Sequence, residues 1–162
     1  MSLRSAILAC SFAVLPALAH AHVEIENVYA RVASPVAQSA AVYMTIRNHS
    51  ADDDRVFQVT SDVAQRIELH TTEQDDAGVM RMLELEDGLP IASNETVSLM
   101  PGGNHVMLMG LNGPLEQGDT FEMTVFFDVW LPMVVTVTVD NEAAAALAEG
   151  HGDGDGHGHS DH

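Results

Sequence analysis

Short runs of alternating hydrophobic and polar residues fill the chain from residue 23 onward. In the run 40–47, Val42, Met44 and Ile46 fall on one face of an extended strand, and polar or aromatic residues fall on the other. Clusters of Gly, Asn, Asp and Pro separate the runs, and no long helical period is visible. Seven to nine short strands of this kind predict an all-β fold, an antiparallel β-sandwich. The remaining predicted strands cover 55–60, 65–70, 79–85, 96–100, 105–111, 120–129 and 133–139.

The first residues have the pattern of an export signal. Residues 1–21 begin with a positive residue, Arg4, and continue with an apolar run that is too short to span a bilayer. Small residues then offer cleavage after Ala19 or after Ala21. The apolar stretch before Cys10 is too short for the alternative of a lipid-modified cysteine. We therefore expect an exported, periplasmic protein with no membrane span.

The exported part divides into three segments. Residues 22–140 hold the predicted β domain, and 141–149 form a short helix or linker. The last segment, 150–162, contains five Gly, four His, three Asp and one Ser, with nothing apolar to bury. We expect it to be a solvated, disordered tail.

Charge and cysteine content exclude several classes of function. The chain of 162 residues has a formal net charge of −18, from 24 acidic and 6 basic residues. Such a surface repels nucleic acid and anionic lipid. Cys10 is the one cysteine, so no disulfide framework or Cys-pair metal site can form. No nucleophile motif or phosphate-binding loop is present, and we expect a binding protein without enzymatic turnover.

Soft donor atoms cluster in three places. His105 and Met107 lie two residues apart in a predicted strand, so both side chains point to the same face. His70 is expected to close a strand before a loop over 71–78, and Met82 follows that loop. These four side chains can therefore converge on one ion. From the residues alone, metal binding and ordinary packing remain equally open for them.

The donor set favours one metal in particular. Thioethers are soft, neutral ligands that select Cu(I), whereas zinc sites use Cys, His or carboxylate. Met80 and Met109 lie near the four donors and are auxiliary candidates. Four other methionines lie in apolar runs and are expected to pack in the core, as methionine commonly does. They are Met44, Met100, Met123 and Met133.

Three segments together resemble the periplasmic PCu(A)C copper chaperone family: Val-Met-Arg-Met at 79–82, Leu-Met-Pro-Gly-Gly-Asn-His-Val-Met-Leu-Met-Gly-Leu at 99–111, and Tyr-Ala-Arg at 29–31. The family has an optional methionine where this chain has Thr71. Its spacer before the His-x-Met pair is also about one residue shorter than the twenty-two residues of 83–104.

This resemblance implies a cupredoxin-like β-sandwich of the Greek-key type and a Cu(I) site made by His70, Met82, His105 and Met107. It also implies delivery of copper to cytochrome oxidase assembly, especially to the Cu(A) centre. The expected partner is the Cu(A) subunit or another copper chaperone, and we expect a monomer.

The tail and the mature N-terminus offer further donors. Imidazole and carboxylate groups interleaved with glycine make the tail a candidate Cu(II) site of modest affinity. A periplasmic copper-sequestering resistance protein is therefore an alternative function. His22, if it is the first residue after cleavage, is an auxiliary copper ligand through its amine and ring. The four tail histidines are His151, His157, His159 and His162.

Overall fold

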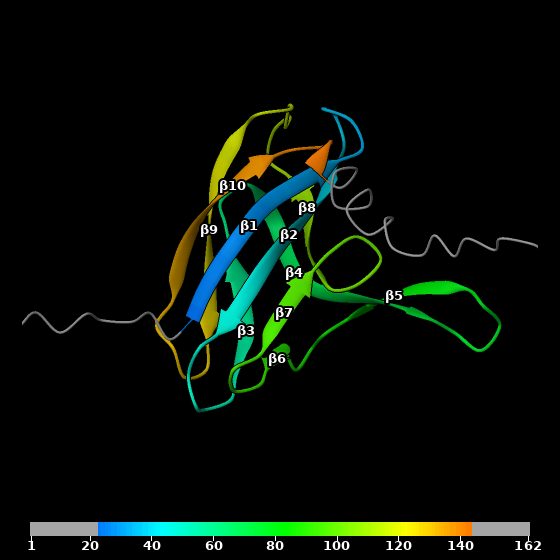
Figure 1. Ribbon diagram of the computed structural model, residues 1–162. Helices are drawn as coiled ribbons and strands as arrows, with labels where there is room; N and C mark the ends of the chain where they lie inside the picture. Colours follow the sequence, from blue (N-terminus) through cyan, green and yellow to red (C-terminus); the bar gives the residue numbers. More distant parts are fainter. Residues whose placement is uncertain (1–22, 144–162) are drawn as a thin grey trace, which may run out of the picture.

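The computed structural model describes residues 23–143, which form ten strands in two facing layers (Figure 1). The segments expected to be a signal peptide (1–21) and a disordered tail (150–162) lie outside the described residues, as does most of 141–149. The strands are β1 (Val23–Val32), β2 (Ser39–Asn48), β3 (Asp54–Thr60), β4 (Ala64–Gln74), β5 (Met80–Glu84), β6 (Leu89–Ile91), β7 (Thr96–Leu99), β8 (His105–Leu111), β9 (Thr120–Phe127) and β10 (Met133–Val139).

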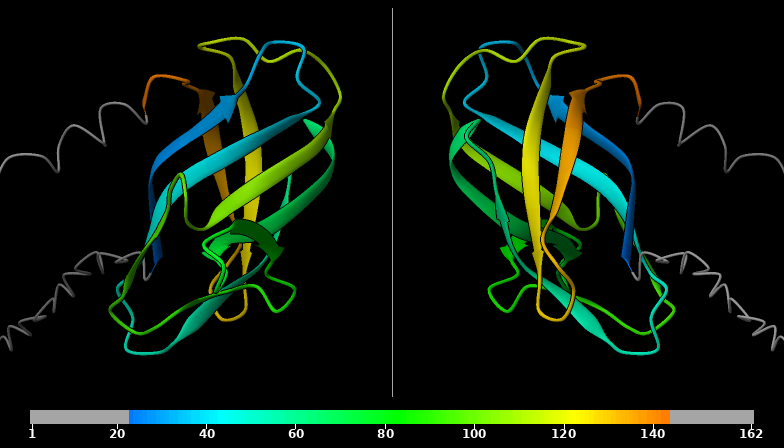
Figure 2. Two further views of the ribbon diagram at one scale, coloured as in Figure 1. Left: turned by 90° about the vertical axis from the view of Figure 1, so that its right-hand side faces the viewer. Right: turned by 90° about the vertical axis from the view of Figure 1, so that its left-hand side faces the viewer.

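The strands follow the spatial order β5-β4-β8-β2-β1-β10-β9-β3-β6, and β7 pairs with β2 beside β8. Every pairing is antiparallel except that of β1 with β10, which is parallel and joins the two layers. Figure 2 shows the layers from the side, with β9 and β10 crossing the direction of β2 and β8. The predicted all-β sandwich is therefore confirmed, with one parallel pair added.

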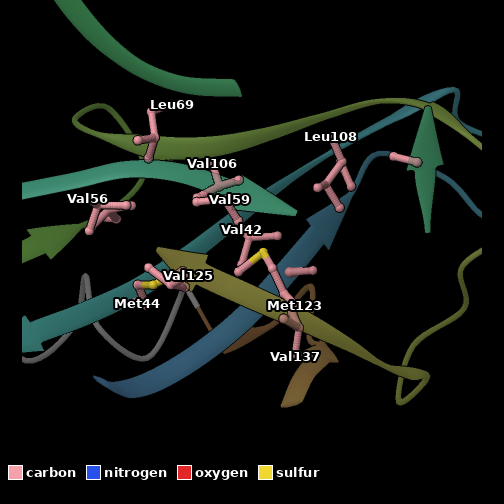
Figure 3. Close-up of a cluster of buried hydrophobic side chains, with 14 of the residues drawn as sticks. Val42, Met44, Val56, Val59, Leu69, Val106, Leu108, Met123, Val125 and Val137 are labelled. Carbon is pink, nitrogen blue, oxygen red and sulfur yellow. The ribbon is translucent and has the colours of Figure 1, made fainter. Parts of the chain in front are cut away.

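The core lies between the layers and is built from one face of the strands other than β5 (Figure 3). On β8, Val106 and Leu108 are fully buried, which turns His105 and Met107 to the outer face, as predicted. Burying each such aliphatic side chain contributes about 1.5–3 kcal/mol. Core side chains from β3, β9 and β10 complete the cluster: Val56, Val59, Met123, Val125, Val137 and Val139.

Two strands have no clear signal in the hydrophobic pattern. In β1 the backbone of Asn27 has a φ of 54°, and the register with β2 shifts between Glu26 and Tyr29. This bulge breaks the two-residue alternation on which strand prediction depends. Strand β6 has three residues and contains Pro90, which a sheet tolerates at an edge such as this one.

The prediction of a loop over 71–78 is wrong. Strand β4 continues past His70 to Gln74, and β5 pairs with it from Met80↔Gln74 to Glu84↔His70. The hairpin projects from the body of the sandwich (Figure 1), and all five residues of β5 are exposed. We call residues 71–84 the arm. Thr71 and Thr72 favour extended backbone, and pairing with β5 carries the strand past His70.

The structure also corrects the prediction that one of the four core methionines is buried. Met44 and Met123 are buried and Met133 packs against the core, as expected. Met100 instead lies just after β7 and is 50% exposed, because the chain leaves the sheet there to form a turn. In the described part of the chain, no helix is long and apolar enough to cross a membrane.

Candidate metal centre

Two histidines from different segments face each other on the outer surface of the sheet. His70 on β4 and His105 on β8 are directly opposite in the strand register. Their rings meet edge to face, with centroids 5.7 Å apart. The residues next to them in sequence, Leu69 and Val106, are buried in the core, so both imidazoles must point away from it.

A turn between β7 and β8 sets the position of His105. Both strands pair with β2, β7 beside Met44 and β8 beside Val42, so the segment between them arches out of the sheet. Gly102 has a φ of 83°, a backbone conformation that favours glycine. His105 enters β8 directly after this turn and is only 6% exposed. The Pro-Gly-Gly-Asn sequence thus delivers the imidazole to the sheet in a fixed place.

The same turn determines which nitrogen of His105 carries the proton. Its Nδ1 lies 3.1 Å from the carbonyl oxygen of Gly103. Since a carbonyl oxygen only accepts, Nδ1–H is the donor, and a neutral ring keeps its lone pair on Nε2. A metal-ligating histidine is commonly oriented in this way, by a backbone carbonyl on its other nitrogen.

Met107 lies on the same face of β8, two residues beyond His105, and is partly buried. In the register its neighbours are Ala41 on β2 and Glu68 on β4. The small side chain of Ala41 leaves room beside the thioether. The structure therefore brings together three of the four predicted ligands: His70, His105 and Met107.

Met82 is placed differently. It lies on the arm opposite Thr72, and the residue opposite His70 on β5 is Glu84. Met82 shares the outer face with His70 but is a diagonal neighbour, a relation that separates Cα atoms by about 7–8 Å. Its side chain is 60% exposed. Met82 therefore lies on the same face as His70, at the solvent-exposed rim of the candidate site.

The two auxiliary methionines extend the same face in opposite directions. Met80 lies two residues before Met82 and is exposed. Met109 lies two residues after Met107, between Arg66 and Ser39, and is partly buried. Neither lies in register with His70 or His105. Thioethers therefore form an incomplete row along the outer face.

Sequence reasoning missed Glu68, which is hydrogen-bonded to His70, one of the two facing histidines. Its Oε2 lies 2.8 Å from Nε2 of His70, and its Oε1 pairs with Arg66. The hydrogen bond with His70 lowers the pKa of the Glu68 carboxyl below its ordinary value; burial opposes this, and Arg66 adds to it. Because Glu68 precedes His70 by two residues on a strand, the same-face rule that paired His105 with Met107 would have identified it.

Aromatic rings border the site on the side of β2. The ring of Tyr43 lies 6.3 Å from that of His105, and Tyr29 on β1 lies 5.2 Å from Tyr43. Burial raises the pKa of both phenols above the ordinary value, so they stay neutral. The donors are thus flanked by neutral aromatic rings on one side and by the open arm on the other.

One buried nitrogen in the site has no partner. Nδ1 of His70 is inaccessible to solvent and makes no hydrogen bond. An unsatisfied buried polar atom is costly, of order 1–3 kcal/mol, unless a ligand uses it. An imidazole lone pair beside a second imidazole and a thioether fits a soft or borderline metal ion.

Carboxylates do not complete a site of another kind in the described range. Among residues 23–143, no group of three or more His, Cys, Asp or Glu side chains is arranged to hold a metal. His22 and the tail histidines 151, 157, 159 and 162 lie outside this range, so their expected roles stay predictions.

Comparison with known proteins defines the class. The family described as "Putative lipoprotein LpqE-like" matches residues 23–139, and the chain belongs to this family. Two relatives are a "Putative lipoprotein Lxx21020" of Leifsonia xyli, 36% identical over 87 residues, and an "Uncharacterized protein RP573" of Rickettsia prowazekii, 32% identical over 99 residues. The matches cover 54% and 61% of this chain. They span about half the length of these relatives, 52% and 54% respectively.

Solved structures extend the comparison to copper proteins. The copper-bound PCuAC domain from PmoF2 matches with a TM-score of 0.62 at 23% identity, over 74% of this chain and 93% of that domain. The Cu(I) form of DR1885 from Deinococcus radiodurans matches with a TM-score of 0.56 at 28% identity, over 78% of this chain and 81% of that one. The resemblance to PCu(A)C proteins and the cupredoxin-like fold are confirmed.

Proposed function

We propose that this protein is an exported copper chaperone that carries one Cu(I) ion as cargo on His70, Met82, His105 and Met107. The observation that carries the proposal is the facing pair of imidazoles, with Met107 on the same surface and Nδ1 of His70 buried without a partner. Two imidazoles and two thioethers form a neutral donor set that suits Cu(I) better than harder ions. The copper-bound and Cu(I)-bound PCuAC relatives support the same reading.

These residues are suited to exchanging a copper ion with another protein, not to catalysing a reaction. His70 and His105 provide borderline nitrogen donors in a partly buried place, whereas Met82 provides a weak donor at the exposed rim. A site that is open on one side lets an acceptor's ligands replace the rim donor first. We infer that the acceptor is the Cu(A) subunit of cytochrome oxidase, or another copper chaperone, in the periplasm, and that the protein is not an enzyme.

Copper titration tests the binding site. The mature chain, residues 22–162, is titrated with Cu(I) against a competing chelator. We expect one tightly bound Cu(I) per chain and a large loss of affinity in H105A and M107A. A matched control is H49A, because His49 is an exposed histidine paired with Glu24. Unchanged affinity in H105A and M107A would refute the ligand assignment.

A transfer assay tests the delivery role. The copper-loaded chain is mixed with an apo Cu(A) domain, and the appearance of the copper spectrum of the acceptor is followed. Faster transfer than from a Cu(I)–chelator complex of equal affinity supports a chaperone. Transfer no faster than from that complex contradicts delivery while leaving copper binding intact.

The histidines of the tail support a second candidate function, copper sequestration for resistance. Removing residues 150–162 would then abolish most Cu(II) binding and most protection of cells against copper. The Cu(I) site of the β domain would be unaffected by the deletion. A chaperone in which the tail has no part would show neither loss.

A further inference from the structure

We propose that Glu68 is a positioning residue that holds His70 in the Nε2–H tautomer, so that His70 binds copper through Nδ1 while His105 binds it through Nε2. The inference deepens the proposed function and rests on it. It goes further in naming the atom on each ring and a residue that selects one of them.

The bond between Glu68 and His70 fixes which ring nitrogen of His70 is the donor. Nε2 of His70 lies 2.8 Å from Oε2 of Glu68. An ionised carboxylate only accepts hydrogen bonds, so the proton of a neutral His70 ring must be on Nε2. A charge-assisted bond of this kind is stronger than a bond between neutral groups. The carboxylate therefore selects one tautomer.

Glu68 is itself held in place by a second partner. Its other oxygen pairs with Arg66, on the same face of the same strand, and its side chain is only 11% exposed. Met107 lies opposite it on β8. With one oxygen paired with Arg66 and the other bonded to His70, the carboxylate has little freedom to leave the histidine.

The bond with Glu68 leaves the other ring nitrogen of His70 free to bind a metal ion. With the proton on Nε2, the lone pair of His70 is on Nδ1, which is buried and has no hydrogen-bond partner. Within the described part of the chain, the other side-chain atom in this condition is the hydroxyl oxygen of Tyr29. The lone pair of His70 is shielded from water, makes no hydrogen bond and lies beside a second imidazole. It is therefore available to bind a metal ion.

The two rings are thus prepared in opposite ways. Gly103 takes the Nδ1 proton of His105 and frees Nε2, whereas Glu68 takes the Nε2 proton of His70 and frees Nδ1. Rings that meet edge to face can then present different nitrogens to one ion. A backbone carbonyl and a carboxylate are the two partners that commonly orient metal-ligating histidines.

Nitrogen NMR of the mature chain tests the tautomers before any copper is added. At about pH 8, above the ordinary imidazole pKa of about 6.5, the wild-type chain should show the Nε2–H form for His70 and the Nδ1–H form for His105. E68A should leave His70 in a mixture of both forms. E68Q should restore the Nε2–H form, because the amide oxygen also accepts. E84A is the matched control, since Glu84 is the exposed carboxylate opposite His70 on the arm.

Copper affinity gives the second readout. Loss of an outer partner of a ligand typically costs 10–100-fold in metal affinity. We expect a loss of that size in E68A, partial recovery in E68Q and no change in E84A. A His70 that is Nδ1–H in the apo chain, or that binds copper through Nε2, overturns the inference. If the wild-type chain binds no Cu(I), the proposed function fails, and the apo tautomers still decide the role of Glu68.

Discussion

The two halves of the candidate copper site differ in how firmly the fold holds them. His105 and Met107 lie on β8, which is paired on one side with β4 and on the other with β2. Met82 lies on the arm, in an edge strand whose residues are all exposed. The first half is fixed by the core beneath it, and the second is held by one row of hairpin hydrogen bonds. A carrier that must both bind and release an ion can use this division.

The largest expected effect is on stability. Leu108 lies directly under the β8 half of the site and is fully buried, so L108A should lower the free energy of unfolding by about 2–5 kcal/mol. Leu83 on the arm is an exposed leucine, and L83A should change it by less than about 0.5 kcal/mol. Chemical denaturation of the two variants checks this. Similar losses in both would show that the arm is part of the cooperative core.

The loss of Cu(I) affinity should also be larger for a substitution on β8 than for one on the arm. M107L removes a thioether from the rigid half and is expected to weaken Cu(I) binding about 100-fold, or about 2.7 kcal/mol. M82L removes one from the arm and should cost about tenfold, or about 1.4 kcal/mol. M100L, which alters an exposed methionine on a turn, is the control and should have no effect. Competition with a Cu(I) chelator measures all three, and a larger loss in M82L would reverse the comparison.

The same difference explains what could be predicted from sequence. Within one strand, alternation placed His105 and Met107 on a common face, and burial of Val106 confirms it. Strand register is not local, and nothing in the sequence alone sets His70 opposite His105. Glu68 could have been predicted from its two-residue spacing to His70, but a carboxylate is not one of the soft donors that indicate a Cu(I) site.

The fold was predictable for a similar reason, and its gaps have local causes. Alternating runs identified the central strands, including all of β8. The bulge at Asn27 hid β1, and the three residues of β6 around Pro90 are too few to show a period. The extension of β4 beyond His70 depends on pairing with β5, which is a contact between segments.

The smallest expected effect is confined to the tip of the arm. Asp75 accepts hydrogen bonds from the backbone of Ala77 and Val79 and pairs with Arg81 at 2.8 Å. The bond with Arg81, and then that with Val79, lowers the pKa of Asp75 below its ordinary value of 3.8. A carboxyl with a depressed pKa in the folded state contributes stability above its ordinary pKa and loses it as the pH falls through the depressed value.

Acidification below about pH 4 should therefore loosen the turn of the arm. The Val79 amide should shift with a midpoint below 3.8 in the wild-type chain and show no such step in D75N. At neutral pH, D75N should already show faster exchange of the Ala77 and Val79 amides, with the Val106 amide as protected as before. Faster exchange at Val106 as well would mean that the arm and the body open together, and the proposed division of the site into a fixed and a movable half would be wrong.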